Sequence, residues 1–230
     1  MGCDGRGDLE RIAHVIERTG ADIVGLNEVD VNFHRRSGFV DQVSWLSKRL
    51  KMEGVFGPAI AIKDPLRHTK RQYGNALLSK IPIQEYRNEI FSGRIGNEPR
   101  SLLRVKLQHG ERRFQVFVTH MGLTPWMRNR QTKRIVELCH KNKLPLVVMG
   151  DWNVLPDHSE VQCLSPYLLD VATTISGSGF TYPCKAPRKR IDYIFCSFHF
   201  QVNVAQIVST PDCPSDHLPV YCELEWKEKR

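Results

Sequence analysis

The chain has 230 residues, of which 41% are hydrophobic and 25% charged, a composition typical of one sizeable globular domain. No run of 18 apolar residues could span a membrane, and the polar first ten residues argue against a secretory signal. The net charge of +8 favours anionic partners such as nucleic acid, although many cytoplasmic proteins are equally basic without one.

Seven cysteines are scattered along the chain, and no two of them form a CxxC pair. The odd number and the irregular spacing argue against a zinc site or a disulfide framework. Cys139, Cys196 and Cys222 stand among apolar neighbours and are expected to act as small buried hydrophobic residues. We therefore expect free thiols in a reducing cytoplasm.

The first fifty residues predict two helices that flank a strand. Residues 8–20 predict an amphipathic helix, with Asp8 as its N-cap and Gly20 as its stop. Residues 21–29 predict a short buried strand, and residues 39–50 predict a second amphipathic helix.

The rest of the chain is rich in predicted strands. A third helix is expected at residues 127–142, where Ile135, Leu138 and Cys139 face inward. A turn is expected at His109 and Gly110. The predicted strands cover residues 55–62, 73–80, 83–90, 101–108, 113–120, 144–150, 191–197, 200–209 and 218–226.

This order of elements predicts a single domain over residues 1–230, since there is no repeat, low-complexity tract or long linker. Two sheets packed face to face, with helices outside, would use both the aliphatic strands and the one-sided helices. The expected fold class is therefore a layered α/β sandwich.

Polar side chains stand at the ends of five apolar strands, where a rigid sheet could position them. Each alone has an ordinary explanation, such as a solvated acid, a structural histidine, an Asx turn or a surface ion pair. Five such coincidences together indicate one functional site. The residues are Glu28, His120, Asp151 with Asn153, Asp192, and Asp216 with His217.

The ordered set of motifs resembles the endonuclease/exonuclease/phosphatase superfamily, which includes pancreatic-type deoxyribonuclease and abasic-site endonucleases. The resemblance implies a four-layer α/β/β/α sandwich with two mixed, largely antiparallel sheets, and divalent-metal-dependent hydrolysis of phosphoesters. The matching segments are ADIVGLNEVD (21–30), YGNALLSKIPI (73–83), EPRSLLRVKL (98–107), FVTHMG (117–122), VVMGDWNVLPD (147–157), RIDYIF (190–195) and SDHLPV (215–220).

The resemblance implies Mg²⁺ (or Mn²⁺) as the cofactor, because such hard cations prefer oxygen ligands. Glu28 would bind the ion, and Asp216 would join it or bind a second one. Asp151 would orient or deprotonate the attacking water. Asn153 would donate to a phosphoryl oxygen or fix Asp151.

The remaining implied roles concern charge on the phosphate. His217 would stabilise the developing negative charge, with Asp192 holding its imidazolium. His120 would contact the phosphate from the other side, oriented by Glu98. Arg100 would contact the anion or pair only with Glu98.

The chain departs from the resemblance at its start. The family begins with a strand carrying an asparagine that supports the metal site, whereas this chain begins at MGCDGRGDLERIA. A lost central strand would leave unpaired backbone groups and a gap in the core, unless another segment fills the slot.

Three functions remain open. A nuclease is favoured by basic clusters at residues 67–71, 128–134 and 185–190, and by Trp126 and Trp152, which could stack on bases or pack inside. A phosphatase or phosphodiesterase acting on a small anionic metabolite or lipid head group is favoured by the short chain. A catalytically impaired binding module is favoured by the missing strand. No obligate protein partner is predicted.

Overall fold

The computed structural model describes residues 2–5, 7–64, 69–93, 96–175 and 177–228. Its largest sheet has six strands in the order β4-β5-β6-β7-β9-β8. Only β6 and β7 pair in parallel, and the other neighbours are antiparallel. The strands are β4 (Ile83–Phe91), β5 (Arg100–His109), β6 (Arg112–His120), β7 (Leu146–Asp151), β8 (Leu168–Asp170) and β9 (Asp192–Ser197).

The second strand layer is divided into two pieces. One piece has the order β1-β3-β2, and the other is the hairpin β10-β11. Both pieces pack on the same face of the six-stranded sheet, where Leu77 of the first and Leu224 of the second meet Val116 in one apolar cluster. The strands are β1 (Ile23–Val31), β2 (Glu53–Asp64), β3 (Thr69–Ser79), β10 (Phe200–Ile207) and β11 (Val220–Trp226).

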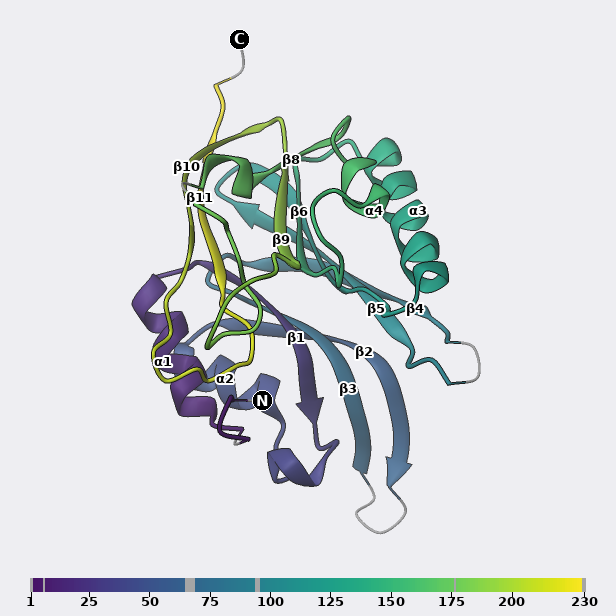
Figure 1. The fold of residues 1–230 in the computed structure, drawn as a ribbon, viewed down its shortest axis with the longest axis vertical. Helices are drawn as coiled ribbons and strands as arrows, with labels where there is room; N and C mark the ends of the chain where they lie inside the picture. Colours follow the sequence, from purple (N-terminus) through teal and green to yellow (C-terminus); the bar gives the residue numbers. More distant parts are fainter. Residues whose placement is uncertain (1, 6, 65–68, 94–95, 176, 229–230) are drawn as a thin grey trace.

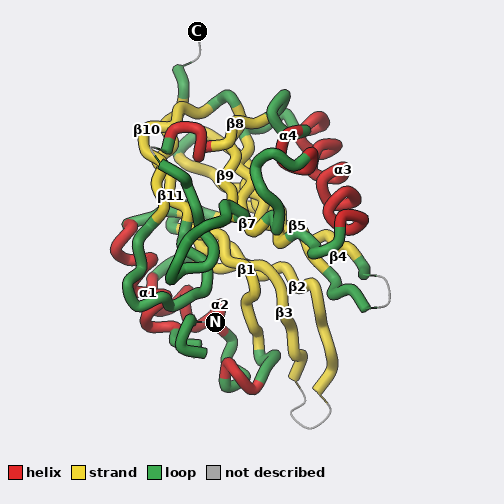
Figure 2. The backbone as a smooth tube through the Cα atoms, in the orientation of Figure 1, coloured by secondary structure: helices red, strands yellow, loops and turns green. Residues whose placement is uncertain are grey.

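Helices cover the two outer faces, which completes four layers (Figures 1 and 2). On one side, α1 (Leu9–Thr19) and α2 (Gln42–Leu50) pack over the three-stranded sheet, with Ala13 and Leu46 against Leu78. On the other side, α3 (Pro125–Lys141) and the short α4 (Ser159–Gln162) pack over the six-stranded sheet. The α/β/β/α sandwich predicted from the sequence is confirmed.

Local signals explain most of the helix ends. The Asp8 carboxylate accepts a hydrogen bond from the Arg11 backbone N–H, and Gly20 ends α1 in a left-handed conformation, as expected. The predicted start of the second helix at residue 39 is wrong. Phe39 has a φ of +56°, which is incompatible with a helix, and Asp41 caps α2 instead.

Short elements and one crosslink escaped the sequence analysis. Four elements are too short for a repeating apolar pattern to predict them. They are the helix α4, the strand β8 and the 3₁₀ turns η1 (Arg35–Ser37) and η2 (Val171–Thr174). A disulfide joins Cys184 to Cys213, so the expectation of seven free thiols is wrong. The two cysteines are 29 residues apart, and only the fold brings them together. No helix in the described ranges is long and apolar enough to cross a membrane.

Candidate active site

Three of the candidate residues lie abreast at one edge of the six-stranded sheet. In the strand registers, His120 of β6 pairs with Asp151 of β7, and Asp151 pairs with Asp192 of β9. The parallel pairing of β6 and β7 brings their carboxyl ends to the same edge, and the antiparallel β9 begins there. Sheet pairing alone thus brings together residues that are far apart in the sequence.

A tight turn after β7 fixes the Asp151 side chain. Gly150 has a φ of +142°, and a Cβ at this position would lie 1.8 Å from the Thr119 carbonyl oxygen. Asn153, at a φ of +53°, donates its backbone N–H to Asp151 Oδ1 (2.8 Å) and its side-chain amide to the Met121 carbonyl (3.0 Å). The turn therefore needs glycine before the carboxylate and a residue tolerant of left-handed backbone after it.

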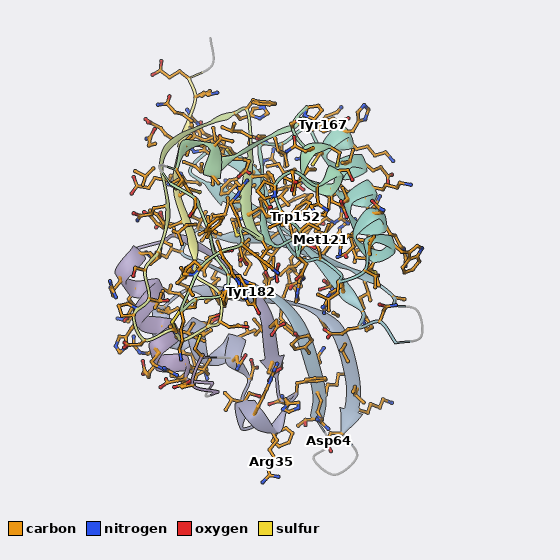
Figure 3. The ribbon with its side chains drawn as sticks, in the orientation of Figure 1. Arg35, Asp64, Met121, Trp152, Tyr167 and Tyr182 are labelled. Atoms are coloured by element: carbon orange, nitrogen blue, oxygen red, sulfur yellow. A yellow bond between two sulfur atoms is a disulfide. The ribbon has the colours of Figure 1, made fainter. Side chains whose placement is uncertain are left out.

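Trp152 faces away from this turn into the core. Its side chain is fully buried and packs edge-on against Tyr193 and Phe195. Of the two alternatives for this tryptophan, packing under the turn is confirmed and base stacking is wrong. Trp126, in contrast, is 39% exposed on α3. Figure 3 shows Trp152 beside Met121 in the middle of the molecule.

His217 and Asp192 form a charge-assisted pair. Nδ1 of His217 lies 2.8 Å from Asp192 Oδ2, and the Tyr182 ring lies 4.8 Å from the imidazole. Burial lowers the pKa of His217, but the hydrogen bond that its ring donates to Asp192 and the charges of Asp192, Asp151 and Asp216 outweigh it and raise the pKa to about 9. The ring is therefore an imidazolium at neutral pH, with Nε2 directed away from Asp192.

Burial shifts the pKa values of Asp151 and His120 in opposite directions. It raises the pKa of Asp151 to about 7, and the charges of Asp192 and Glu28 add to the shift. It lowers the pKa of His120 to about 3, with further lowering by the charges of Arg100 and His217. His120 is therefore neutral at pH 7, and its Nε2 lies 3.5 Å from Asp151 Oδ2.

Glu28 and Asp216 approach the same cavity from the other strand layer. A bulge in β1 between Leu26 and Val29 leaves Glu28 exposed at a φ of +57°. Asp216 is exposed on the loop before β11, where its carbonyl accepts from the Cys184 N–H (2.7 Å). A cavity of about 1190 Å³ is lined by the proposed metal and catalytic groups Glu28, Asp151, Asp192, Asp216 and His217.

Arg100 and Glu98 are engaged with each other by a hydrogen-bonded ion pair. Arg100 is only 5% exposed, and its charge acts on His120 as described above. Of the two roles considered for Arg100, this geometry favours pairing with Glu98 over direct contact with an anion. Glu98 is thereby drawn toward Arg100 rather than toward His120.

Sequence reasoning missed an amide bridge that connects the two strand layers beneath the site. Asn27 Oδ1 accepts from the Asp151 backbone N–H (2.9 Å), and its Nδ2 donates to Asn75 Oδ1 (2.7 Å) and to the Thr119 carbonyl (2.9 Å). Asn75 in turn donates to the Ser101 carbonyl (2.9 Å). The available signal was a polar amide inside each of two apolar strands.

The donor set fits a hard divalent cation. Glu28, Asp216 and Asp151 are among the residues that line the cavity, and carboxylate oxygens are ligands that Mg²⁺ prefers. Burial and the charges of Asp192 and Glu28 raise the pKa of Asp151, the charge of His217 lowers it, and a bound cation would lower it further. Asp151, Asp192 and His217 also bring ligand atoms within 4.8 Å of one another, but Asp192 and His217 already bond to each other.

The sequence profile of the Endonuclease/Exonuclease/phosphatase family matches residues 2–217. No curated protein sequence matches the chain.

Solved structures share the fold at low sequence identity. An endonuclease/exonuclease/phosphatase from Beutenbergia cavernae is 22% identical, covering 98% of this chain and 68% of its own, with a TM-score of 0.83. A Bacteroides thetaiotaomicron mannosyl-6-phosphatase is 19% identical over 95% of this chain and 90% of its own (TM-score 0.76). The human Nocturnin catalytic domain with bound sulfate is 22% identical over 94% and 85% (TM-score 0.71). The chain belongs to the endonuclease/exonuclease/phosphatase family.

Proposed function

We propose that the protein is a divalent-metal-dependent phosphoester hydrolase of the phosphodiesterase or nuclease type. The observation that carries this proposal is the hydrogen-bonded pair of His217 and Asp192, with the buried side chain of Asp151 beside it. A charged donor next to a carboxylate suits attack by water on a negatively charged phosphoester.

Glu28 and Asp216 are proposed as the ligands of Mg²⁺ (or Mn²⁺), since both are exposed acidic residues that line the cavity. When bound, the cation neutralises negative charge on the phosphoryl oxygens. The fit to magnesium rests on the oxygen-only character of these ligands.

Asp151 is proposed as the residue that orients and deprotonates the attacking water. Its Oδ1 accepts from the Asn153 N–H, so Oδ2 is the atom available to receive a proton. Asn153 is proposed to fix Asp151 through its backbone N–H, while its side-chain amide donates one hydrogen bond to the Met121 carbonyl. Neutral His120, beside Oδ2, is proposed to donate a hydrogen bond within the same site.

His217 is proposed to donate from Nε2 to a phosphoryl oxygen as negative charge develops there. Its Nδ1 is committed to Asp192, which fixes the ring orientation and keeps the proton on Nε2. Aligned donors of this kind are worth about 10²–10³-fold in turnover.

Basic residues beside the site favour an anionic substrate. Fewer of them are free to contact it than the three basic clusters in the sequence suggested. Within the cluster at 128–134, Arg128 is buried against Glu160 (3.0 Å) and Arg134 pairs with Glu89 (2.9 Å). Residues 185–189 are exposed and follow Tyr182, the neighbour of His217. Of the cluster at 67–71, Arg67 and His68 lie outside the described residues.

A small anionic phosphoester is the second candidate substrate, because two of the arginines in the cluster at 128–134 are held in ion pairs and residues 185–189 are a short basic cluster near His217. The cytoplasmic location and the lack of an obligate protein partner stay predictions. The Cys184–Cys213 disulfide does not favour a cytoplasmic location, since disulfides persist in oxidising compartments.

A substrate panel separates these functions. Supercoiled plasmid, abasic DNA, RNA and small phosphoesters are incubated with the protein and Mg²⁺, Mn²⁺ or a chelator. We expect metal-dependent hydrolysis, and steep inhibition by salt if the substrate is a nucleic acid. His217→Ala should lower turnover about 10²-fold or more with the fold intact, whereas His14→Ala, at an exposed position on α1, should not. Hydrolysis of no member of the panel would leave the impaired binding module as the better description.

A further inference from the structure

A second cavity lies on the outer face of the six-stranded sheet, over β4, β5 and β6, and has a volume of about 240 Å³. On β5, Arg104 lies two residues after Leu102, which packs in the apolar cluster beneath α3, so both side chains point to the face that α3 covers. Three of the lining residues are cations and one is an acid, so positive charge predominates. The lining residues are Glu85, Tyr86, Arg87, Arg104, Lys106 and Gln115.

This cavity is distant from the candidate active site. Gln115 precedes His120 by five residues on β6, which corresponds to about 16 Å along an extended strand. None of the residues that line the second cavity also lines the larger cavity of about 1190 Å³. A ligand in the second cavity would therefore not contact the groups proposed for hydrolysis.

Two arginines of this cavity stand directly opposite each other in the sheet. In the antiparallel pairing of β4 with β5, Arg87 is the partner of Arg104. The Cβ atoms of such partners are about 4.5–5.5 Å apart, and like charges in this position destabilise a sheet. An anion held between the two guanidinium groups would replace this repulsion with charge-assisted hydrogen bonds.

The acid of the cavity positions two of the cations. Glu85 accepts from Arg87 Nε at Oε1 (2.8 Å) and from Lys106 Nζ at Oε2 (2.7 Å). The side chains of Arg87 and Lys106 are nevertheless 71% and 45% exposed, so both can be reached by a solute. One carboxylate thus holds two cations in place and neutralises only one positive charge.

Arg104 lacks such a partner at its Nε. This atom is buried and accepted by no hydrogen-bonding group among the described residues. The two acids whose charges act on Arg104 are engaged with other cations, Glu85 with Arg87 and Glu89 with Arg134 of α3 (2.9 Å). Burial lowers the pKa of Arg104, and the charges of Arg134 and Arg87 lower it further. Because buried donors normally have an acceptor, the unpaired Nε points to a ligand.

We propose that this cavity, the Arg87–Arg104 pocket, is a second anion site that binds the phosphate group of a small molecule. Arg87 and Arg104 donate to its oxygens from opposite strands, and Lys106 supplies a third positive charge. Three cations and one carboxylate leave two positive charges, which match a phosphate dianion better than a single carboxylate. Inorganic phosphate and a phosphomonoester present the same chemistry, and this binding does not depend on the proposed hydrolysis.

The test is an NMR titration of the whole protein with inorganic phosphate at constant ionic strength. The side-chain Nε–H signal of Arg104 is assigned by its absence from Arg104→Met, and it should shift until the site is saturated. Sodium sulfate should compete, whereas sodium chloride should produce no saturable shift. Since phosphate could also enter the candidate active site, the titration is repeated in His217→Ala, where the shift at Arg104 should persist with the same midpoint.

Variants of opposite expected effect localise the binding, with calorimetry of phosphate binding in the His217→Ala background as the measurement. Arg104→Met removes the opposed guanidinium and should weaken binding about tenfold or more. Glu85→Gln keeps an acceptor but removes the negative charge, so it should tighten binding about threefold. Arg18→Met, at an exposed position of α1, should leave the affinity unchanged. Urea unfolding checks that each variant is folded.

The source of the phosphate is separated by comparing inorganic phosphate with glycerol phosphate. Tighter binding of the first supports free phosphate as the ligand, and tighter binding of the second supports a phosphorylated metabolite. The proposal is overturned if Arg104→Met binds phosphate as well as its parent, or if the Arg104 signal stops responding in His217→Ala. A shift that sodium chloride reproduces would show general charge screening and would also overturn it.

Discussion

Asp151 is surrounded by groups that control both its proton and its position. One carboxylate oxygen accepts from Asn153 and the other faces His120, while burial and the charges of Asp192 and Glu28 raise its pKa to about 7. Asp151, Asp192 and His217 could be proposed from the sequence because they stand at the ends of predicted apolar strands. It did not reveal Asn27, because an amide inside a short strand gives no periodic signal.

Replacing Asp192 tests the origin of the His217 charge. In Asp192→Asn, burial of the imidazole is no longer opposed by the carboxylate, so the pKa of His217 should fall from about 9 to its ordinary value of about 6.5 or below. NMR titration in the presence of chelator measures the shift. Asp157→Asn, at an exposed position nearby, should leave it unchanged, and a pKa that stays near 9 in Asp192→Asn would refute the pairing.

Removing the amide of Asn27 should destabilise the junction between the two strand layers. Asn27→Ala leaves the Asp151 N–H and the Thr119 carbonyl without this partner, which should cost about 1–3 kcal/mol of unfolding free energy. Urea denaturation measures the loss. Asn129→Ala, at an exposed position of α3, should change stability by less than about 0.5 kcal/mol. Equal stability of the two variants would show that the bridge contributes nothing.

At the scale of elements, two loops and one turn position side chains of the site. The turn after β7 aims Asp151, and the disulfide joins the loop of Tyr182 to the loop that leads to His217. The sequence predicted most helices and strands to within a few residues, because their apolar periods are clear. It did not predict the disulfide, since the pairing of distant cysteines depends on the tertiary fold.

The turn after β7 should not tolerate a side chain at its glycine. In Gly150→Ala the new Cβ would meet the Thr119 carbonyl at 1.8 Å, so β6 and β7 would have to separate at the site. We expect a loss well above the roughly 1 kcal/mol typical of alanine at an unhindered positive φ. Gly110→Ala, at a φ of +60° with open space around it, supplies that reference. Similar unfolding free energies for the two variants would contradict the steric account.

Breaking the disulfide should lower the free energy of unfolding, because the unfolded chain gains conformational entropy. The crosslink closes a loop of 29 residues, for which chain entropy gives about 3–4 kcal/mol. The double variant Cys184→Ser, Cys213→Ser should unfold at lower urea concentration than the oxidised protein. Cys163→Ser, at an exposed free cysteine, is the control, and a reductant should have no effect on the double variant.

At the scale of the whole molecule, two halves of the fold meet at the site. The six-stranded sheet supplies His120, Asp151 and Asp192, and the divided second layer supplies Glu28 and the loop of Asp216 and His217. The order of motifs predicted this sandwich. Strand neighbours and the amide bridge depended on long-range pairing and could not be read from local patterns.

The central claim is that the cavity at this site binds a divalent cation and uses Asp151 to hydrolyse a phosphoester. The most direct measurement is the rate of bis-p-nitrophenyl phosphate hydrolysis as Mg²⁺ is titrated, for the unmodified protein, Asp151→Asn and the control Asp157→Asn. We predict saturable activation by Mg²⁺, loss with EDTA, and a drop of about 10²-fold or more in Asp151→Asn alone. Equal rates with EDTA, or an unchanged rate in Asp151→Asn, would contradict the account.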